Sequence, residues 1–206
     1  MLYTTLNNIH QRCDLSAYCW HGLLDHLNKS GADDDRLSFA TILEANGLYA
    51  AVQCLGSVDG HDREIQLFAV ACARRIEHLD TSGHAKQIND VSRRFAIGLA
   101  TRDELATVVR GATHTYTRPS NATAQAAREA AFDAAAGAAC AASMDAAAGA
   151  AWWAMGEVLR EAIAKKDMLC AATWDDAWGA AWHAARDAQK ADFIAMFCTD
   201  DNMHAG

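Results

Sequence analysis

Hydrophobic residues recur every three or four positions along the first 110 residues, which is the spacing of one face of an α-helix. The clearest stripe lies in residues 62–79, where Ile65, Phe68 and Cys72 fall on one side. No run alternates apolar and polar residues as a half-buried strand does. The pattern predicts helices over residues 14–28, 38–55, 62–79 and 84–98, and a fifth that begins near residue 101.

Polar residues at the starts of these stripes support the predicted helices. Asp14 and Ser38 each precede an apolar stripe and can cap a helix by accepting a backbone N–H. Thr101 is followed three residues later by Glu104, which is the spacing of a capping box. We therefore expect the fifth helix to begin at this pair.

Glycines lie near the expected helix ends. Gly31 follows the first helix, and Gly56 and Gly60 separate the second from the third. Between these breaks the stripes continue, and we expect Tyr49 and Leu99 to lie on the inward faces of the second and fourth helices.

Residues 122–191 differ in composition, because 30 of these 70 residues are alanine. Alanine has the highest helix propensity and covers little surface, so we expect closely packed helices here. Pro119, the one proline in the chain, marks the boundary between the two halves. The predicted fold is all-α, with an N-terminal helical bundle at residues 1–115 and long alanine-rich antiparallel helices at residues 116–206, packed together as one body.

The charge of the chain disfavours direct binding to nucleic acid. The formal net charge is −8, and no segment concentrates lysine and arginine as phosphate neutralisation requires. An acidic chain of this kind leaves room for a basic protein partner, or for mimicry of a nucleic acid.

The cysteines and the hydropathy pattern indicate a cytoplasmic protein. The seven cysteines are widely spaced and odd in number, and no secretory signal precedes them, so we expect reduced thiols. The most apolar stretch, residues 134–155, consists mainly of alanine and glycine with Asp145 inside it. Because such residues gain too little on transfer to hold an aspartate in a bilayer, we expect no membrane association.

Tryptophans and carboxylates gather near the end of the alanine-rich half. Trp174, Trp178 and Trp182 recur every fourth residue and so lie near one helix face. They can fill the space between small alanines, or they can form a ridge that binds a partner. The predicted partner-binding residues are Trp174, Asp175, Asp176, Trp178, Trp182 and Asp187.

The most polar short segment precedes the third predicted helix and contains Asp59, His61, Asp62 and Arg63. Carboxylates here can stabilise the first turn of the helix by pairing with its free N–H groups. The alternative is a small polar site in which His61 acts as a base or ligand, oriented by Asp62 or Glu64.

Motifs for metal binding and for nucleophilic catalysis are missing from the sequence. It has no Cys-x-x-Cys, no His-Glu-x-x-His, no Gly-x-Ser-x-Gly and no phosphate-binding glycine loop. Cys72 lies on an apolar helical face, where a thiol is normally inert. We therefore expect no metal, no cofactor and no enzymatic activity.

Three short segments stand out beside the alanine tract with its interspersed Trp and Asp residues. They are Asp-Gly-His-Asp-Arg-Glu at 59–64, Leu-Phe-Ala-Val-Ala-Cys-Ala-Arg-Arg at 67–75 and Gly-Leu-Ala-Thr-Arg-Asp-Glu-Leu at 98–105. Together these features resemble a family of alanine-rich, helical immunity proteins found in bacterial toxin neighbourhoods and in phage and prophage genomes. The resemblance implies a non-enzymatic inhibitor.

We therefore predict an inhibitor that occludes a protein target, either a bacterial toxin or a component of a defence system. In the first case it is an immunity protein, and in the second a phage-encoded antagonist such as an anti-CRISPR. The alternative is a helical protein that sequesters a small molecule or nucleotide, with Arg63, Arg74 or Arg75 holding phosphate. Exposed aromatic stripes also favour a homodimer.

Overall fold

The computed structural model describes residues 1–75, 77, 83–114 and 187–199, and this part of the chain is predominantly helical. The predicted all-α class is therefore confirmed, while the long alanine-rich antiparallel helices and the boundary at Pro119 lie outside the described residues. A helical segment at residues 187–193 leads directly into the last element. The elements in chain order are β1 (Tyr3–Thr4), α1 (Leu6–Arg12), α2 (Ala17–His26), β2 (Leu37–Ser38), α3 (Phe39–Cys54), η1 (Leu55–Ser57), α4 (Asp62–Arg74), α5 (His84–Ala96), α6 (Arg102–His114) and the π-helix η3 (Ile194–Cys198).

Two of the predicted helix starts are confirmed. Ser38 caps α3, because its hydroxyl accepts the backbone N–H of Thr41 at 3.1 Å. At the start of α6 the capping box is complete: the backbone N–H of Thr101 donates to Oε2 of Glu104 at 2.6 Å, and the backbone N–H of Glu104 donates to the Thr101 hydroxyl at 3.1 Å. These signals work because each cap depends only on residues close in sequence.

The start of α2 differs from the prediction, whereas its end lies close to the predicted residue 28. The predicted cap at Asp14 is wrong, because Ser16 caps the helix by accepting the N–H of Cys19 at 3.3 Å. The chain leaves the helix at Asn28, whose φ of 53° is left-handed. Asparagine is one of the few residues other than glycine that adopts this conformation readily at a helix end.

Helix α1 was not expected from the pattern. It is seven residues long, and Thr5 caps it by accepting the N–H of Asn8 at 3.1 Å. Its buried residues are Leu6 and Ile9, which are too few to form a recognisable stripe. The helix is therefore held mainly by packing on the rest of the protein.

Helix α3 contains a break that changes which residues face inward. Gly47 has φ 77° and ψ −179°, a conformation open to glycine and outside the helical region. After it, Leu48 and Val52 are buried while Tyr49 is 52% exposed. The prediction of Tyr49 on the inward face is therefore wrong, because it assumed one continuous helix.

Leu99 also lies outside the core. Helix α5 ends at Ala96, and Gly98 takes a left-handed φ of 74°. The inward stripe therefore stops before Leu99, which is 66% exposed. Ile88 and Val91 are buried as predicted.

A short sheet joins the beginning of the chain to the start of α3. Strands β1 and β2 are antiparallel, with Tyr3 opposite Ser38 and Thr4 opposite Leu37. The sequence pattern does not indicate this sheet, because two-residue strands are too short to show alternation.

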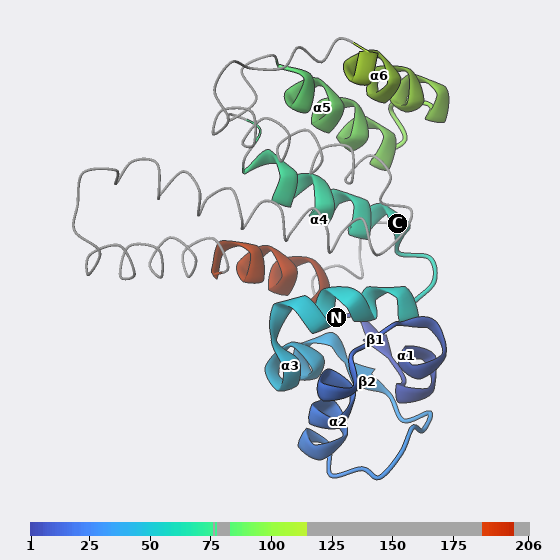
Figure 1. The fold of residues 1–206 in the computed structure, drawn as a ribbon, viewed down its shortest axis with the longest axis vertical. Helices are drawn as coiled ribbons and strands as arrows, with labels where there is room; N and C mark the ends of the chain where they lie inside the picture. The colour runs from blue at the N-terminus through green and yellow to red at the C-terminus, as the bar shows by residue number, and fades with distance from the viewer. Residues whose placement is uncertain (76, 78–82, 115–186, 200–206) are drawn as a thin grey trace, which may run out of the picture.

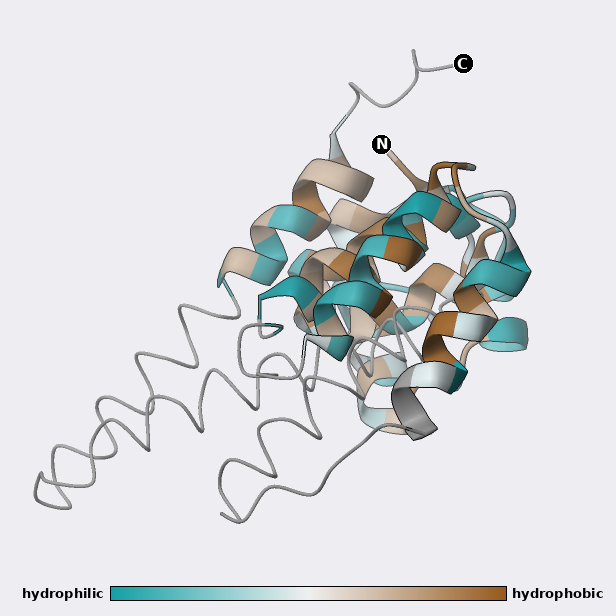
Figure 2. Cartoon of the chain, turned by 90° about the horizontal axis from the view of Figure 1, so that it is seen from above, coloured by the Kyte–Doolittle hydropathy of each residue, from teal (hydrophilic) through white to brown (hydrophobic). Residues whose placement is uncertain are grey.

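The C-terminal segment lies between the two halves of the described fold. In Figure 1 the residues that lead into η3 lie between α3 on one side and α4 on the other, with α5 and α6 beyond α4. Figure 2 shows hydrophobic residues on the inner faces of these helices and hydrophilic residues on the outer faces. Phe193, Phe197 and Cys198 thus belong to the same core as the apolar residues between positions 2 and 109.

Four phenylalanines form the centre of this core. Phe193 packs on Phe68 in an edge-to-face arrangement with ring centroids 5.7 Å apart, and Phe197 does so at 5.8 Å. Phe39 from α3 lies 6.3 Å from Phe193. All four side chains are almost completely buried, so this phenylalanine cluster joins α3 and α4 through the C-terminal segment.

The described part of the chain, with its gaps at 76, 78–82, 115–186 and 200–206, includes no helix of the length and apolar content needed to cross a bilayer.

We predict that Phe193→Ala lowers the free energy of unfolding by about 3–5 kcal/mol, because it removes a fully buried ring and leaves a cavity. Urea denaturation followed by circular dichroism measures the change. Lys190→Ala, an exposed position in the same segment, is the control and should change stability by about 0.5 kcal/mol or less. Equal effects of the two substitutions would show that the segment does not hold the core together.

Candidate functional site

A hollow opens on the surface where the first residues, the start of α4 and η3 meet. Its volume is about 280 Å3, and it is open to solvent. The described residues that line it are Met1, Leu2, Tyr3, His61, Glu64, Met196 and Phe197. Most of these walls are apolar, and two titratable side chains from α4 and its N-terminal boundary complete them.

His61 and Glu64 form the polar part of the hollow. His61 occupies the position just before α4, and Glu64 lies in the first turn. The Nδ1 atom of His61 is 3.7 Å from Oε2 of Glu64, and both side chains are close to 40% exposed. The pairing corresponds to one of the two orientations considered from the sequence, in which Glu64 and not Asp62 lies beside the imidazole.

The other residues of the predicted polar site do not line the hollow. Asp59 pairs with Arg12 of α1 through two hydrogen bonds of 2.8 Å and 2.6 Å. Asp62 is exposed in the first turn of α4, where a carboxylate stabilises the helix dipole. Arg63 is also exposed. The segment therefore divides its polar residues between helix stabilisation, a contact with α1 and the hollow.

The two-bond contact between Arg12 and Asp59 changes the acidity of the carboxyl group. Hydrogen bonds from the Arg12 guanidinium, with its positive charge, hold the pKa of Asp59 below its ordinary value. The pair ties α1 to the loop before α4, and so helps to place His61 at the edge of the hollow.

The contribution of η3 could not be found from the sequence. Met196 and Phe197 belong to this π-helix, and π-helices are rare and are often found at functional sites. The backbone N–H of Leu2 donates to the carbonyl of Phe197 at 2.7 Å, which fixes one wall against the other. Residues 2, 61 and 197 meet only through the fold, and no local pattern marks them as neighbours.

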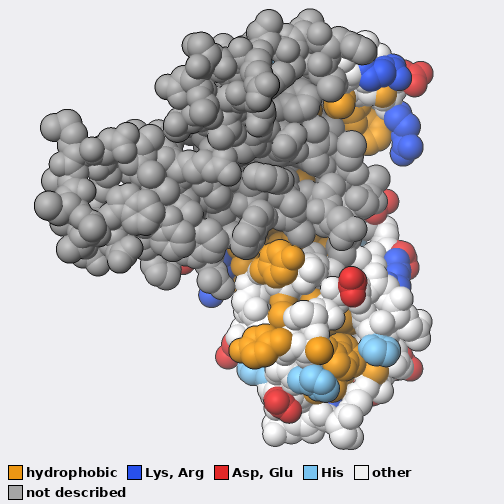
Figure 3. Space-filling view, in the orientation of Figure 1, with side chains coloured by type: hydrophobic (Ala, Val, Ile, Leu, Met, Phe, Trp, Pro, Cys, Tyr) orange, Lys and Arg blue, Asp and Glu red, His pale blue; other side chains and the backbone are white. Residues whose placement is uncertain are grey.

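A second notable surface is formed by α2 and α3, and we call it the aromatic face. Tyr18 on α2 is 89% exposed, and Tyr49 on α3 also reaches solvent. The two helices are joined by a hydrogen bond of 2.7 Å from Asn46 Nδ2 to the carbonyl of Cys19. Figure 3 shows hydrophobic side chains on the surface over these helices, with histidines among them.

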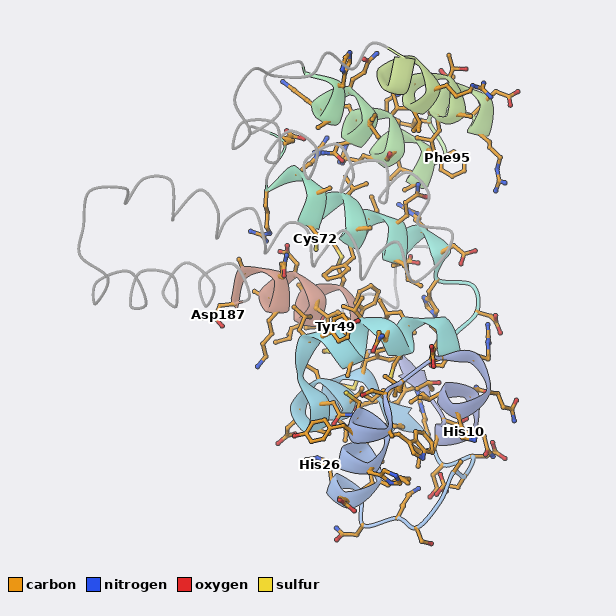
Figure 4. The ribbon with its side chains drawn as sticks, viewed as in Figure 1. His10, His26, Tyr49, Cys72, Phe95 and Asp187 are labelled. Atoms are coloured by element: carbon orange, nitrogen blue, oxygen red, sulfur yellow. The ribbon has the colours of Figure 1, made fainter. Side chains whose placement is uncertain are left out.

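The aromatic face continues toward α1. The rings of His10 and Trp20 lie 5.0 Å apart with an angle of 34° between their planes. Figure 4 places His10, His26 and Tyr49 on the part of the molecule built from α1, α2 and α3. Tyr18, His21 and Asp25 are all exposed and follow one another at helical spacing, so the face carries acidic as well as aromatic groups.

Most of the predicted partner-binding ridge lies outside the described residues. This applies to Trp174, Asp175, Asp176, Trp178 and Trp182. Asp187 is described: it begins the helical segment 187–193 and is exposed, as Figure 4 shows. The ridge itself stays a prediction.

Two of the three arginines considered for phosphate binding, Arg74 and Arg75, are engaged in the fold, whereas Arg63 is exposed. Arg74 pairs with Asp90 of α5. Arg75 pairs with Asp192, and it also donates to the carbonyl of Ala188 at 3.2 Å. Both guanidinium groups therefore connect α4 to neighbouring segments, and a phosphate would have to compete with carboxylates already in place.

The described cysteines are free thiols. Burial raises the pKa of Cys72 to about 12 and that of Cys13 to about 11, and it also raises the pKa of Cys54. Since the thiolate is the nucleophile, these groups are poorly suited to nucleophilic chemistry. Figure 4 shows Cys72 within α4, in the interior of the helical stack.

Over the described ranges, no three side chains among His, Cys, Asp and Glu come together as ligands for a metal ion.

Comparison with models of known families, with curated proteins and with solved structures finds no match.

We predict that Arg12→Gln raises the pKa of Asp59 toward the ordinary value of about 3.9. The pKa of Asp59 is lower in the folded protein than in the unfolded chain. The stabilisation by this pair is therefore complete at a pH above the ordinary pKa, and it is lost as the pH falls through the lower pKa of the folded protein. Titration of the Asp59 carboxyl carbon by NMR measures both proteins. An Asp59 pKa that is the same with and without Arg12 would show that the pair does not form in solution.

We also predict that Cys54 and Cys72 react with iodoacetamide at least about 100-fold more slowly in the native protein than in guanidinium chloride, because burial suppresses the thiolate. Mass spectrometry of the labelled peptides measures each site. Fast native labelling of Cys72 would identify a reactive thiol and contradict a purely structural role.

Proposed function

We propose that this protein is a non-catalytic inhibitor that binds another protein, as an immunity protein against a bacterial toxin or as a phage-encoded antagonist of a defence system, such as an anti-CRISPR. The observation that carries the proposal is the aromatic face, where Tyr18 is 89% exposed. Tyrosine is enriched in the few residues that dominate binding at protein interfaces.

The exposed ring of Tyr18 offers apolar surface that a partner can bury. Transfer of such a ring from water into an interface is favourable by roughly 25 cal/mol for each Å2 of apolar surface that is buried. The adjacent α3 adds Tyr49, and the contact of α2 with α3 holds the two helices in fixed positions. A preformed surface of this kind binds without a large cost of ordering.

The charge of the protein favours a basic target. The chain carries a formal net charge of −8, and Asp25 lies on the same exposed side of α2 as Tyr18. Nucleic-acid-binding surfaces of toxins and defence proteins are basic, so an acidic protein can approach them rapidly and occlude them. The predicted ridge of Trp174, Trp178 and Trp182, together with the exposed Asp187, would extend the contact.

The interior of the fold supports a binding role over a catalytic one. Arg74 at the end of α4 and Arg75 directly after it are paired with carboxylates, and the thiol of Cys72 is buried with a raised pKa. These groups maintain the structure. Sequestration of a nucleotide through Arg74 or Arg75 is disfavoured for the same reason.

The test is retention of a partner by the immobilised protein from a bacterial lysate, compared between wild type, Tyr18→Ala and Leu99→Ala. We expect one basic protein to be retained by the wild type and by Leu99→Ala, and its binding to fall about 30-fold in Tyr18→Ala, the loss typical of a dominant interface residue. Leu99 is the matched control because it is a large exposed apolar residue on a different part of the molecule.

The retained protein must also lose activity when the purified wild type is added, since occlusion requires inhibition. Circular dichroism confirms that each variant is folded. No retained protein, equal retention by all three proteins, or a partner that stays fully active would each reject the proposal.

A further inference from the structure

We propose that the hollow formed by the first residues, the start of α4 and η3 binds a small organic cation with an apolar body, such as an aromatic amidine. This goes beyond the proposed function, because it requires no protein partner and uses a different surface from the aromatic face. The inference rests on the shape of the hollow, the chemistry of its walls and the position of Glu64.

The size of the hollow suits a small aromatic molecule. Its volume is about 280 Å3, whereas a dry apolar cavity of about 150 Å3 is enough to bind benzene in another protein. Leu2 and Met196 supply apolar surface, with the buried Phe197 behind them, and methionine adapts easily to the shape of a ligand. A ring with a short polar substituent therefore fits, with the substituent toward the polar edge.

The polar edge selects for positive charge. Among the described residues that line the hollow, none is lysine or arginine, and Glu64 carries the one side chain with a fixed charge. Its carboxylate is only 38% exposed, so a cation placed against it would be partly shielded from water. A planar amidinium can donate two parallel hydrogen bonds to a carboxylate, which is the strongest form of such a contact.

The positive groups at the hollow have contacts of their own. Met1 lines the hollow, and its charged amino group donates to the carbonyl of Thr199 at 2.6 Å. The guanidinium of Arg36 lies over the ring of Tyr3, 3.5 Å from its centroid. The imidazole of His61 lies beside Glu64 and can accept or donate one hydrogen bond to the ligand.

The π-helix supports the same location independently. It contributes two walls of the hollow, through Met196 and Phe197. π-helices are rare, and they occur frequently at functional sites. The hollow thus combines an uncommon backbone element with an ionisable pair, His61 and Glu64, and with apolar walls.

The experiment uses three probes of nearly equal size that differ in charge: benzamidine, benzamide and benzoate. Binding to the full chain is measured by NMR titration of backbone amides. We expect benzamidine to bind saturably, at least about tenfold more tightly than the other two, because only it complements Glu64. The largest shifts should fall on residues 2, 3, 196 and 197.

Two variants complete the test. Glu64→Gln keeps the shape of the side chain and removes its charge, so it should weaken benzamidine binding at least about tenfold. Glu44→Gln is the matched control, since Glu44 is an exposed carboxylate on α3 that does not line the hollow. It should leave the affinity unchanged.

No saturable binding of benzamidine, equal binding of benzamide or benzoate, shifts centred elsewhere, or equal effects of the two variants would each overturn the proposal. Tyr18→Ala separates this inference from the proposed function, because it should reduce retention of the protein partner and leave benzamidine binding intact.

Discussion

The structure depends on the insertion of two phenylalanines from the end of the chain between helices formed near its beginning. Phe193 and Phe197 pack against Phe68 of α4, and Phe193 also contacts Phe39 at the start of α3. Without them, α3 and α4 would face each other across an unfilled apolar space, which interiors packed to normal density do not tolerate. The C-terminal segment is therefore a structural part of the N-terminal helical body.

This insertion also creates the surface features on which binding would depend. Because Phe197 is anchored in the core, its carbonyl is in place to accept the N–H of Leu2, and the beginning and end of the chain form adjoining walls. The ion pair of Arg75 with Asp192 fixes the same segment against α4. The hollow beside Glu64 exists only while these long-range contacts hold, so its geometry is coupled to the stability of the core.

Local rules explain what the sequence could predict. The capping box of Thr101 and Glu104 and the Ser38 cap involve residues three apart, so helix starts could be found from the sequence alone. The break at Gly47 could not, because an isolated glycine in a helical pattern is usually tolerated, and this one error turned Tyr49 inward in the prediction. Of the hollow, the sequence indicated His61 and Glu64. The walls from η3 depend on a contact between distant segments, which periodicity does not encode.

The distribution of charged and aromatic groups links the fold to the proposed binding roles. Arg12, Arg74 and Arg75 are each paired with a carboxylate and connect neighbouring elements. Tyr18 is the opposite case, because its ring is 89% exposed and contributes little to the core. A residue that the fold does not need, held on a rigid helix beside an acidic group, is better explained by contact with another molecule than by folding. That argument favours α2 and α3 as the protein-binding surface, and it leaves the hollow beside Glu64, built by the core itself, as a separate site for a small ligand.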